Sequence, residues 1–144
     1  MHASMKTALI LFALFSLTVF PVSAASNAHP QTLLQYEAVR VALANDDLNG
    51  AKKAAAELAA AAKKESANEI LDASLKLSET NSLGDARKSF QSISVEVEKW
   101  IKGEPGYYAV TCPMIKGSVW IQTTSKIGNP YEGKEMQECG EIKK

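Results

Sequence analysis

Residues 83–100, with the sequence LGDARKSFQSISVEVEKW, carry the clearest periodic pattern in the chain. Apolar side chains recur there at alternating intervals of three and four residues, at Leu83, Ala86, Phe90, Ile93, Val97 and Trp100. This spacing gives one narrow apolar stripe along an α-helix, which is the pattern expected for antiparallel helix packing. Ser82 and Asp85 predict the start of the helix with an imperfect capping box, and Gly103 predicts its end.

Three further helices are predicted before residues 83–100 in the sequence. Together with the helix at 83–100 they are expected to form an antiparallel four-helix bundle over residues 30–103. Their predicted ranges are 31–44, 48–64 and 67–79. Pro30 suits the opening turn of the earliest helix. Asp47 is a good N-cap for the next one, and Ser66 with Glu69 predicts a capping box for the third. The apolar positions that predict their buried faces are Leu33, Tyr36, Val39 and Leu43; Leu48, Ala51, Ala55, Leu58 and Ala62; and Ile70, Leu71, Leu75 and Leu77.

The composition changes after Gly103, where glycine, proline, aromatic and β-branched residues become frequent. Residues 107–111 and 118–123 have the composition of strands, and residues 113–117 that of a turn. Because an isolated hairpin is marginally stable in water, we expect Trp120 to anchor it on the helices. The predicted fold class is therefore mainly α: an antiparallel four-helix bundle with a short C-terminal β-hairpin and an irregular tail that contains cysteine.

Residues 1–24 have the pattern of a secretory signal peptide. Lys6 is their only charged residue, an apolar run extends over residues 8–20, and small residues precede the cleavage site after Ala24. We therefore expect residues 25–144 to form a single domain in the periplasm or outside the cell. The apolar run is shorter than the roughly 20 residues that a membrane-spanning helix needs, so no membrane anchor is expected in the mature protein.

The charge balance gives no reason to expect a nucleic-acid partner. The chain has 16 Lys plus Arg and 16 Asp plus Glu, and loss of Lys6 leaves 15 basic against 16 acidic side chains. A net charge near −1 provides no attraction for nucleic acid or an anionic membrane. Nor is an enzyme expected, because the mature chain keeps only His29 as a histidine base and has no nucleophile elbow, phosphate-binding loop or metal-hydrolase motif.

The only two cysteines in the chain each have a methionine close by. Cys112 is followed two residues later by Met114, and Met136 precedes Cys139 by three. Thiolate and thioether sulfur atoms are soft ligands that select Cu(I) over hard cations. Residues two apart in an extended segment point the same way, and Met136 and Cys139 share a face if residues 135–139 form a helical turn. The four residues therefore predict a Cu(I) or Ag(I) site with the cysteines as principal ligands.

A Cys112–Cys139 disulfide is the alternative. Two cysteines are an even number in the oxidising compartment that an exported protein enters. The bridge would close a loop of nearly thirty residues and stabilise the fold by about 3 kcal/mol on the chain-entropy model. Met114 and Met136 would then be core residues that fill gaps. A zinc site is not expected, since two cysteines and one histidine fall short of four nitrogen or sulfur ligands.

The C-terminal residues resemble the signature of a protein family. The residues that carry the resemblance are Cys112-Pro113-Met114, Val119-Trp120-Ile121-Gln122 and Asn129-Pro130-Tyr131-x-Gly133-x-x-Met136-x-x-Cys139-Gly140. In these positions the chain is similar to the family catalogued as domain of unknown function 3347. That family comprises small exported bacterial proteins and domains fused to periplasmic adaptor subunits of copper and silver efflux pumps. The resemblance implies handling of soft heavy metals outside the cytoplasm, with a periplasmic component of a heavy-metal efflux system as partner.

Two functions are therefore expected. The first is an exported soft-metal-binding protein that buffers Cu(I) or Ag(I) or delivers it to an efflux system. Its metal ligands would be Cys112, Met114, Met136 and Cys139. The residues that would support the loops around those ligands are Trp120, Asn129, Pro130, Tyr131, Gly133 and Gly140. The second is a non-catalytic interaction module of the cell envelope, held together by the Cys112–Cys139 disulfide.

Overall fold

The computed structural model describes residues 29–144, so the signal peptide predicted at residues 1–24 lies outside the described residues. This part of the chain has four helices followed by a small antiparallel sheet. The helices are α1 (Pro30–Ala44), α2 (Leu48–Lys64), α3 (Asn68–Glu79) and α4 (Leu83–Ile101). The strands are β1 (Tyr108–Thr111), β2 (Trp120–Gln122) and β3 (Glu141–Ile142), and the 3-10 turn η1 (Gly133–Glu135) lies between β2 and β3. The mainly helical class predicted from the sequence is confirmed.

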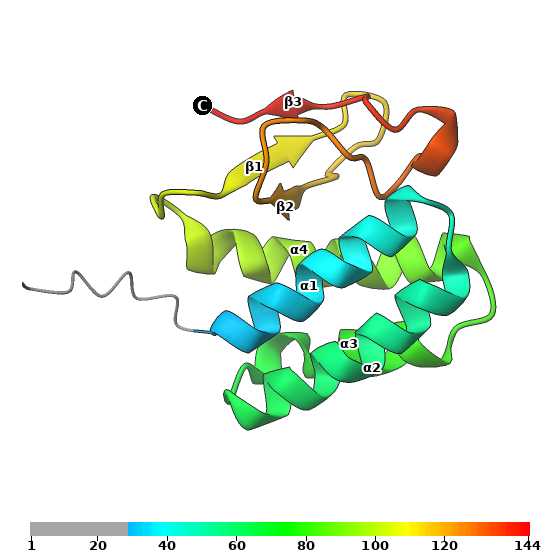
Figure 1. Ribbon diagram of the computed structural model, residues 1–144, viewed down its shortest axis with the longest axis vertical. Coiled ribbons are helices and arrows are strands. Elements are labelled where there is room, and N and C mark those ends of the chain that lie inside the picture. The colour runs from blue at the N-terminus through cyan, green and yellow to red at the C-terminus, as the bar shows by residue number, and fades with distance from the viewer. Residues whose placement is uncertain (1–28) are drawn as a thin grey trace, which may run out of the picture.

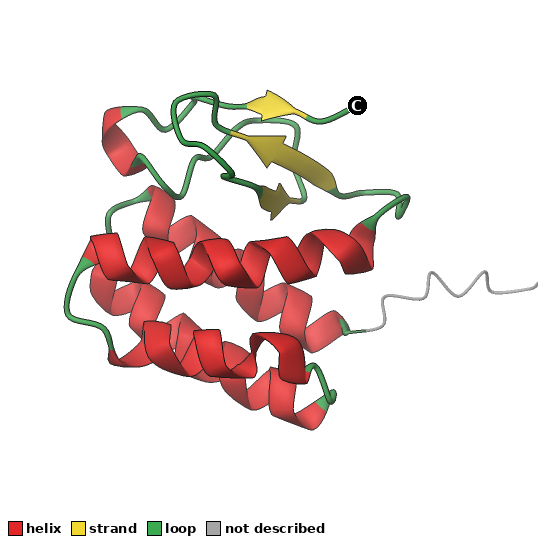
Figure 2. Cartoon of the chain, turned by 180° about the vertical axis from the view of Figure 1, so that it is seen from behind, coloured by secondary structure: helices red, strands yellow, loops and turns green. Residues whose placement is uncertain are grey.

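The elements are stacked in layers (Figure 1). The sheet and its loops lie on one side of α1 and α4, and α2 and α3 lie on the other side, in the view from behind as well (Figure 2). Each helix packs against the next along the chain, and β2 packs against both α1 and α4. α1 and α4 are therefore the helices that position the C-terminal module, which we define as residues 104–144.

β1 lies at the centre of the sheet and pairs antiparallel with both β2 and β3. The structure corrects the predicted strands in two respects. β2 begins at Trp120 rather than at Ser118, because the Ser118 hydroxyl bonds the N–H (2.9 Å) and the carbonyl (3.1 Å) of Cys112 and closes a turn before the strand. The sequence does not predict β3, since its two exposed residues carry no alternating apolar pattern.

Side-chain caps predicted at two helix starts are confirmed. The Asp47 carboxylate accepts a hydrogen bond from the Gly50 N–H (2.8 Å), and the Ser82 hydroxyl accepts one from the Asp85 N–H (3.1 Å). The prediction that Ser66 caps α3 is wrong. Ser66 has a left-handed backbone (φ 59°), and its N–H bonds a carbonyl in the last turn of α2 (3.4 Å). It therefore ends α2 rather than starting α3.

One cluster of buried apolar side chains extends from the helices into the sheet. Trp120 is completely buried in this cluster. The apolar face predicted for the third helix is partly wrong, because Leu75 is 44% exposed and Ser74 takes the buried position beside it. Ser74 tolerates burial since its hydroxyl donates to the Ile70 carbonyl one turn earlier (2.8 Å).

Hydrogen bonds from α1 fix the C-terminal module over the helices. The buried Tyr36 hydroxyl accepts from the Ile121 N–H of β2 (3.0 Å) and lies 2.7 Å from the Ser94 hydroxyl of α4. Arg40 donates to the Gly128 carbonyl (2.7 Å). Burial raises the pKa of Tyr36, so its phenol stays neutral at physiological pH and keeps a proton for the bond with Ser94. α1 thus holds the module through neutral as well as charged groups.

Candidate functional site

Cys112 and Cys139 flank neighbouring strands of the sheet. Cys112 directly follows β1, and Cys139 lies two residues before β3. Because Thr111 pairs with Glu141 in the antiparallel register, the adjoining ends of these strands bring the cysteines together. Their sulfur atoms lie 3.6 Å apart. Both are free thiols in the structure, with Cys112 buried and Cys139 half-buried. We call these two residues the thiol pair.

A turn holds Cys112 in place. Its N–H donates to the Ser118 hydroxyl oxygen (2.9 Å), and the Ser118 hydroxyl donates back to the Cys112 carbonyl (3.1 Å). The same carbonyl accepts a second bond from the Ile115 N–H (3.1 Å). Both backbone polar groups of Cys112 are therefore satisfied without the sheet, which fixes this cysteine independently of its partner. Sequence reasoning missed the role of Ser118, because the residue is assigned to the start of the predicted strand over residues 118–123.

Cys139 sits at the end of a second turn. Its N–H donates to the Met136 carbonyl (3.0 Å), and its own carbonyl accepts from the Asn129 side-chain amide (2.8 Å). The next residue, Gly140, lies so close to the core that a Cβ there would stand 2.8 Å from the Trp120 ring. The prediction of a helical turn over residues 135–139 is wrong, because the 3-10 turn η1 ends before Met136.

Asn129 is a completely buried hub beneath this second turn. Its side-chain oxygen accepts from the N–H groups of Tyr131 (2.8 Å) and Glu132 (3.1 Å), while its amide nitrogen donates to Cys139. Its own N–H donates to the Gln137 carbonyl (2.7 Å). One side chain thus joins the loop after β2 to the segment that carries Cys139, which gives a physical role to a residue that the sequence marked only by its motif.

Replacing Asn129 with alanine is expected to lower the free energy of unfolding by about 2 kcal/mol, because one buried and two partly buried backbone groups lose their partner. Denaturant unfolding followed by circular dichroism measures this loss. Asn45→Ala is the matched control: the Asn45 side chain also bonds a backbone carbonyl, that of Val41 (2.8 Å), but it is exposed. Its loss is expected to stay below about 0.5 kcal/mol. Equal losses in the two variants would contradict the role given to Asn129.

Tyr131 and Trp120 pack together under the loop that contains the motif. Their ring centroids lie 5.9 Å apart in an edge-to-face arrangement. The Tyr131 hydroxyl donates to the Val119 carbonyl (2.6 Å), and burial raises its pKa. These aromatic side chains are therefore structural supports, and neither is free to line a ligand groove.

Arg87 of α4 connects the same loop to the end of α1. Its guanidinium donates to the Pro130 carbonyl (2.8 Å), to the Leu43 carbonyl (3.2 Å) and to the Asp46 carboxylate (2.6 Å). Gly133 closes the arrangement: its φ is 61°, and a Cβ there would overlap the Asp46 carboxylate. The loop that carries Pro130 and Gly133 is thus shaped by the helices beneath it.

Both methionines of the predicted ligand set lie at the surface. Met114 is 68% exposed and Met136 is 40% exposed. The structure therefore brings together the two cysteines of the set and leaves the two thioether side chains largely in solvent. Within residues 29–144, no three His, Cys, Asp or Glu side chains come together as a metal-binding group.

The surroundings of Cys139 favour its protonated form. Its hydrogen bond with the Cys112 thiol is the largest cause of a raised pKa, followed by partial burial and by the negative charges of Cys112, Glu132 and Glu141. A soft metal ion binds the thiolate, so an ion bound here would have to displace protons, and its affinity would rise with pH.

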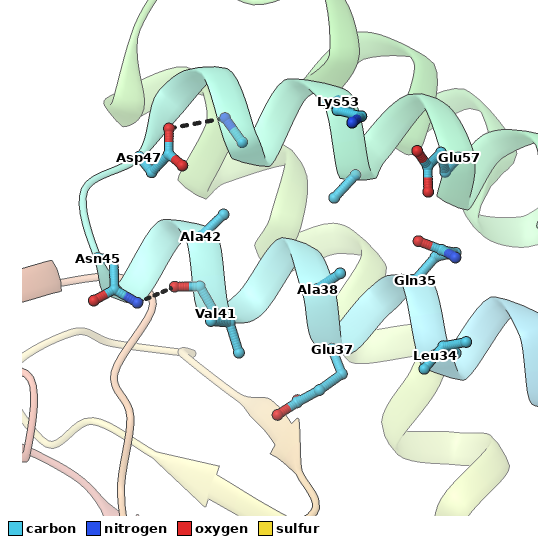
Figure 3. Close-up of a pocket in the computed structure, with 12 residues that line it drawn as sticks. Leu34, Gln35, Glu37, Ala38, Val41, Ala42, Asn45, Asp47, Lys53 and Glu57 are labelled. Carbon is cyan, nitrogen blue, oxygen red and sulfur yellow. Dashed lines mark hydrogen bonds between the residues drawn. The ribbon is translucent and has the colours of Figure 1, made fainter.

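A groove between α1 and α2 forms a recess that lies apart from the thiol pair (Figure 3). Leu34 and Val41 of α1 line it and are 59% and 43% exposed, and Lys53 and Glu57 of α2 lie across from them (Figure 3). Its lining contains no cysteine, methionine or histidine. The groove therefore offers apolar surface but none of the soft ligands that the sequence singled out.

Comparison with known proteins gives no match to this chain, whether with family models, curated proteins or solved structures. The family resemblance noted in the sequence therefore has no support from these comparisons. As to the membrane, none of the helices between residues 29 and 144 combines the length and the apolar composition that a bilayer crossing needs.

Proposed function

We propose that this protein is exported and binds a soft monovalent ion, Cu(I) or Ag(I), through the thiol pair. One observation carries the proposal: the chain has only two cysteines, and their sulfur atoms lie 3.6 Å apart although 27 positions separate them in sequence. Two thiolates at this separation can share one soft ion. The protein would buffer the ion or pass it to a periplasmic component of a heavy-metal efflux system, as the motif resemblance implies.

The surroundings of the thiol pair support this function. Ser118 fixes Cys112 and Asn129 holds the Cys139 segment, so the two sulfur atoms are preorganised before an ion arrives. The carboxylates of Glu132 and Glu141 add negative potential around Cys139, which favours a cation. The exposed Met114 and Met136 side chains are flexible and close in sequence to the cysteines, so they can turn inward as auxiliary ligands.

We also infer that the four helices form an antiparallel bundle and that β1 and β2 form the hairpin expected from the sequence. The packing of each helix on the next and the antiparallel pairing of β1 with β2 support this arrangement. The bundle would act as a rigid, non-catalytic platform for the thiol pair.

Anaerobic titration of the reduced protein with Cu(I), in competition with a chelator, tests the metal proposal. We expect a 1:1 complex that is lost in the Cys112→Ser, Cys139→Ser double variant. Met114→Leu and Met136→Leu keep the side-chain volume but remove the sulfur, and together they should weaken binding by about tenfold (about 1.4 kcal/mol). Ag(I) should give the same ranking. No uptake by the reduced wild-type protein would sink the proposal.

The second candidate is a non-catalytic envelope interaction module with a structural Cys112–Cys139 disulfide. The observation that favours it is that the two sulfur atoms need approach by only about 1.5 Å to reach bonding distance. Thiol counting on protein purified from the export compartment distinguishes the two functions. No free thiols, together with no Cu(I) or Ag(I) uptake after reduction, would favour this module over the metal-binding protein.

A further inference from the structure

The two thiols of the pair are unequally accessible. Cys112 is only 2% exposed, whereas Cys139 is half-buried and presents part of its surface to solvent. We propose that the thiol pair reacts with external disulfides in a fixed order, in which Cys139 attacks first and Cys112 then resolves the mixed disulfide. This activity uses the same two residues as the proposed metal site, but it needs no metal.

The exchange consists of two displacement steps. In the first, the deprotonated Cys139 sulfur attacks one sulfur of a disulfide R–S–S–R; a Cys139–S–R bond forms, and one R–S⁻ leaves and takes up a proton. In the second, the deprotonated Cys112 sulfur attacks the Cys139 sulfur, forms the Cys112–Cys139 bond and releases the other R–S⁻. The protein loses two hydrogens in all, and the external disulfide is reduced to two thiols.

The geometry suits Cys112 to the second step. Its sulfur already lies 3.6 Å from the Cys139 sulfur, and because Cys112 is only 2% exposed, an external disulfide reaches it far less readily than it reaches Cys139. The Ser118 hydrogen bonds hold the Cys112 backbone in place beside Cys139. Cys112 is thus poorly placed to attack an external disulfide and well placed to attack the mixed disulfide at Cys139.

The charges around Cys139 give the reaction a preference among disulfides. Glu132 and Glu141 act on this thiol with negative potential, and they should repel an anionic disulfide and attract a cationic one. The substrate class that fits is therefore a small disulfide with positive charge near the sulfur atoms, or an exposed disulfide on a basic protein surface.

Cystamine, which is a dication, is the probe for the order of attack. Reduced, metal-free Cys112→Ser protein should form a mixed disulfide at Cys139 at least about tenfold faster than the Cys139→Ser protein forms one at Cys112, because the difference in accessibility outweighs the raised pKa of the Cys139 thiol. Mass spectrometry follows both adducts. The wild-type chain should pass through the Cys139 adduct and end without an adduct, two mass units lighter, with two cysteamine molecules released.

The charge preference is tested with 3,3′-dithiodipropionate, a dianion that also has two methylene groups between each sulfur atom and its charged group. The ratio of the cystamine rate to the dithiodipropionate rate should fall several-fold when Glu132→Gln and Glu141→Gln are added to Cys112→Ser. Because the intrinsic reactivity of each probe cancels in this comparison, only the local charge remains. The ratio in Cys112→Ser should also fall as salt is raised, since ions screen the carboxylates.

Equal rates for the two single-cysteine proteins would overturn the proposal, as would a wild-type intermediate whose adduct maps to Cys112. The wild-type mapping, done by acid quench and proteolysis, keeps the test valid even if one serine variant folds poorly. Failure here leaves the metal titration unaffected, because that experiment reads ion uptake by the reduced pair, and a protein that fails to bind Cu(I) can still show the ordered exchange.

Discussion

Replacing Trp120 with alanine is expected to lower the free energy of unfolding by about 4 kcal/mol. The indole is completely buried between the sheet and the helices, and its N–H donates to the buried Gln122 side chain (2.9 Å). Removing it leaves a large cavity beside Tyr131 and Gly140 and also an unpaired Gln122 oxygen lone pair. Since a domain of this size is stable by only about 5–15 kcal/mol, the variant should unfold at a much lower denaturant concentration.

Trp100→Ala is the matched control for this prediction. Trp100 is the chain's other tryptophan, and it is only partly buried at the end of α4, where its ring lies 4.6 Å from the His29 ring. Its loss should cost less than about 2 kcal/mol, because less of its surface leaves water on folding. Guanidinium unfolding of both variants under the same conditions gives the comparison. A smaller loss at Trp120 than at Trp100 would show that the sheet is not anchored where the structure places it.

The helices could be predicted from the sequence because their signals are local. The residues that cap a helix start lie within a few positions of one another, as at Asp47 and Ser82. The apolar residues of the buried face recur at every helical turn. The exception is instructive. Serine is a common N-cap residue, but Ser66 has the left-handed backbone conformation of the turn that ends α2. Its side chain therefore does not cap α3. A local sequence pattern does not show whether a residue in a short connection ends the preceding helix or caps the following one.

The C-terminal module could be predicted only in part, because its shape depends on contacts between distant residues. Both β1 and β2 have strand composition, and the soft-ligand pattern pointed to Cys112 and Cys139, which the fold does bring together. By contrast, the Arg40 contact with the Gly128 carbonyl joins residues 88 positions apart, and no spacing rule connects them. Met114 and Met136 are predicted as ligands because they are close to the cysteines in sequence. Whether their side chains face the thiol pair or the solvent depends on the geometry of the turns that carry them.

Arg87→Met is expected to lower the free energy of unfolding by about 3 kcal/mol, because hydrogen bonds made by a charged group are lost. The Arg87 guanidinium donates three hydrogen bonds that tie α4 to the C-terminal loop and to the end of α1, and its side chain is largely shielded from solvent. Methionine keeps the length of the stem but leaves the Pro130 and Leu43 carbonyls and the Asp46 carboxylate without this donor. Thermal and denaturant unfolding of the variant measure the loss.

Lys88→Met is the matched control, since Lys88 is the next residue on α4 and also pairs with a carboxylate, that of Asp85 (3.3 Å). The Lys88 side chain is 80% exposed, so its removal should change stability by less than about 0.5 kcal/mol. Similar losses in the two variants would mean that Arg87 is an ordinary surface charge and that the loop is held by other contacts.

The same junction predicts how stability depends on pH. The Lys134 N–H and then the Arg87 guanidinium hold the pKa of Asp46 below its ordinary value. A lowered folded-state pKa means that the unfolded chain takes up the proton first, so this stabilisation is complete above the ordinary pKa of 3.8 and is lost as the pH falls through the folded-state value.

In Asp46→Asn, whose side chain tolerates the left-handed backbone there (φ 56°), that part of the stability loss in acid should be absent. The variant's curve of stability against pH should therefore be shallower than that of the wild type below about pH 5, although not flat, because Glu65 and Asp85 also have lowered pKa values. Identical acid slopes in the two proteins would rule out Asp46 as a contributor.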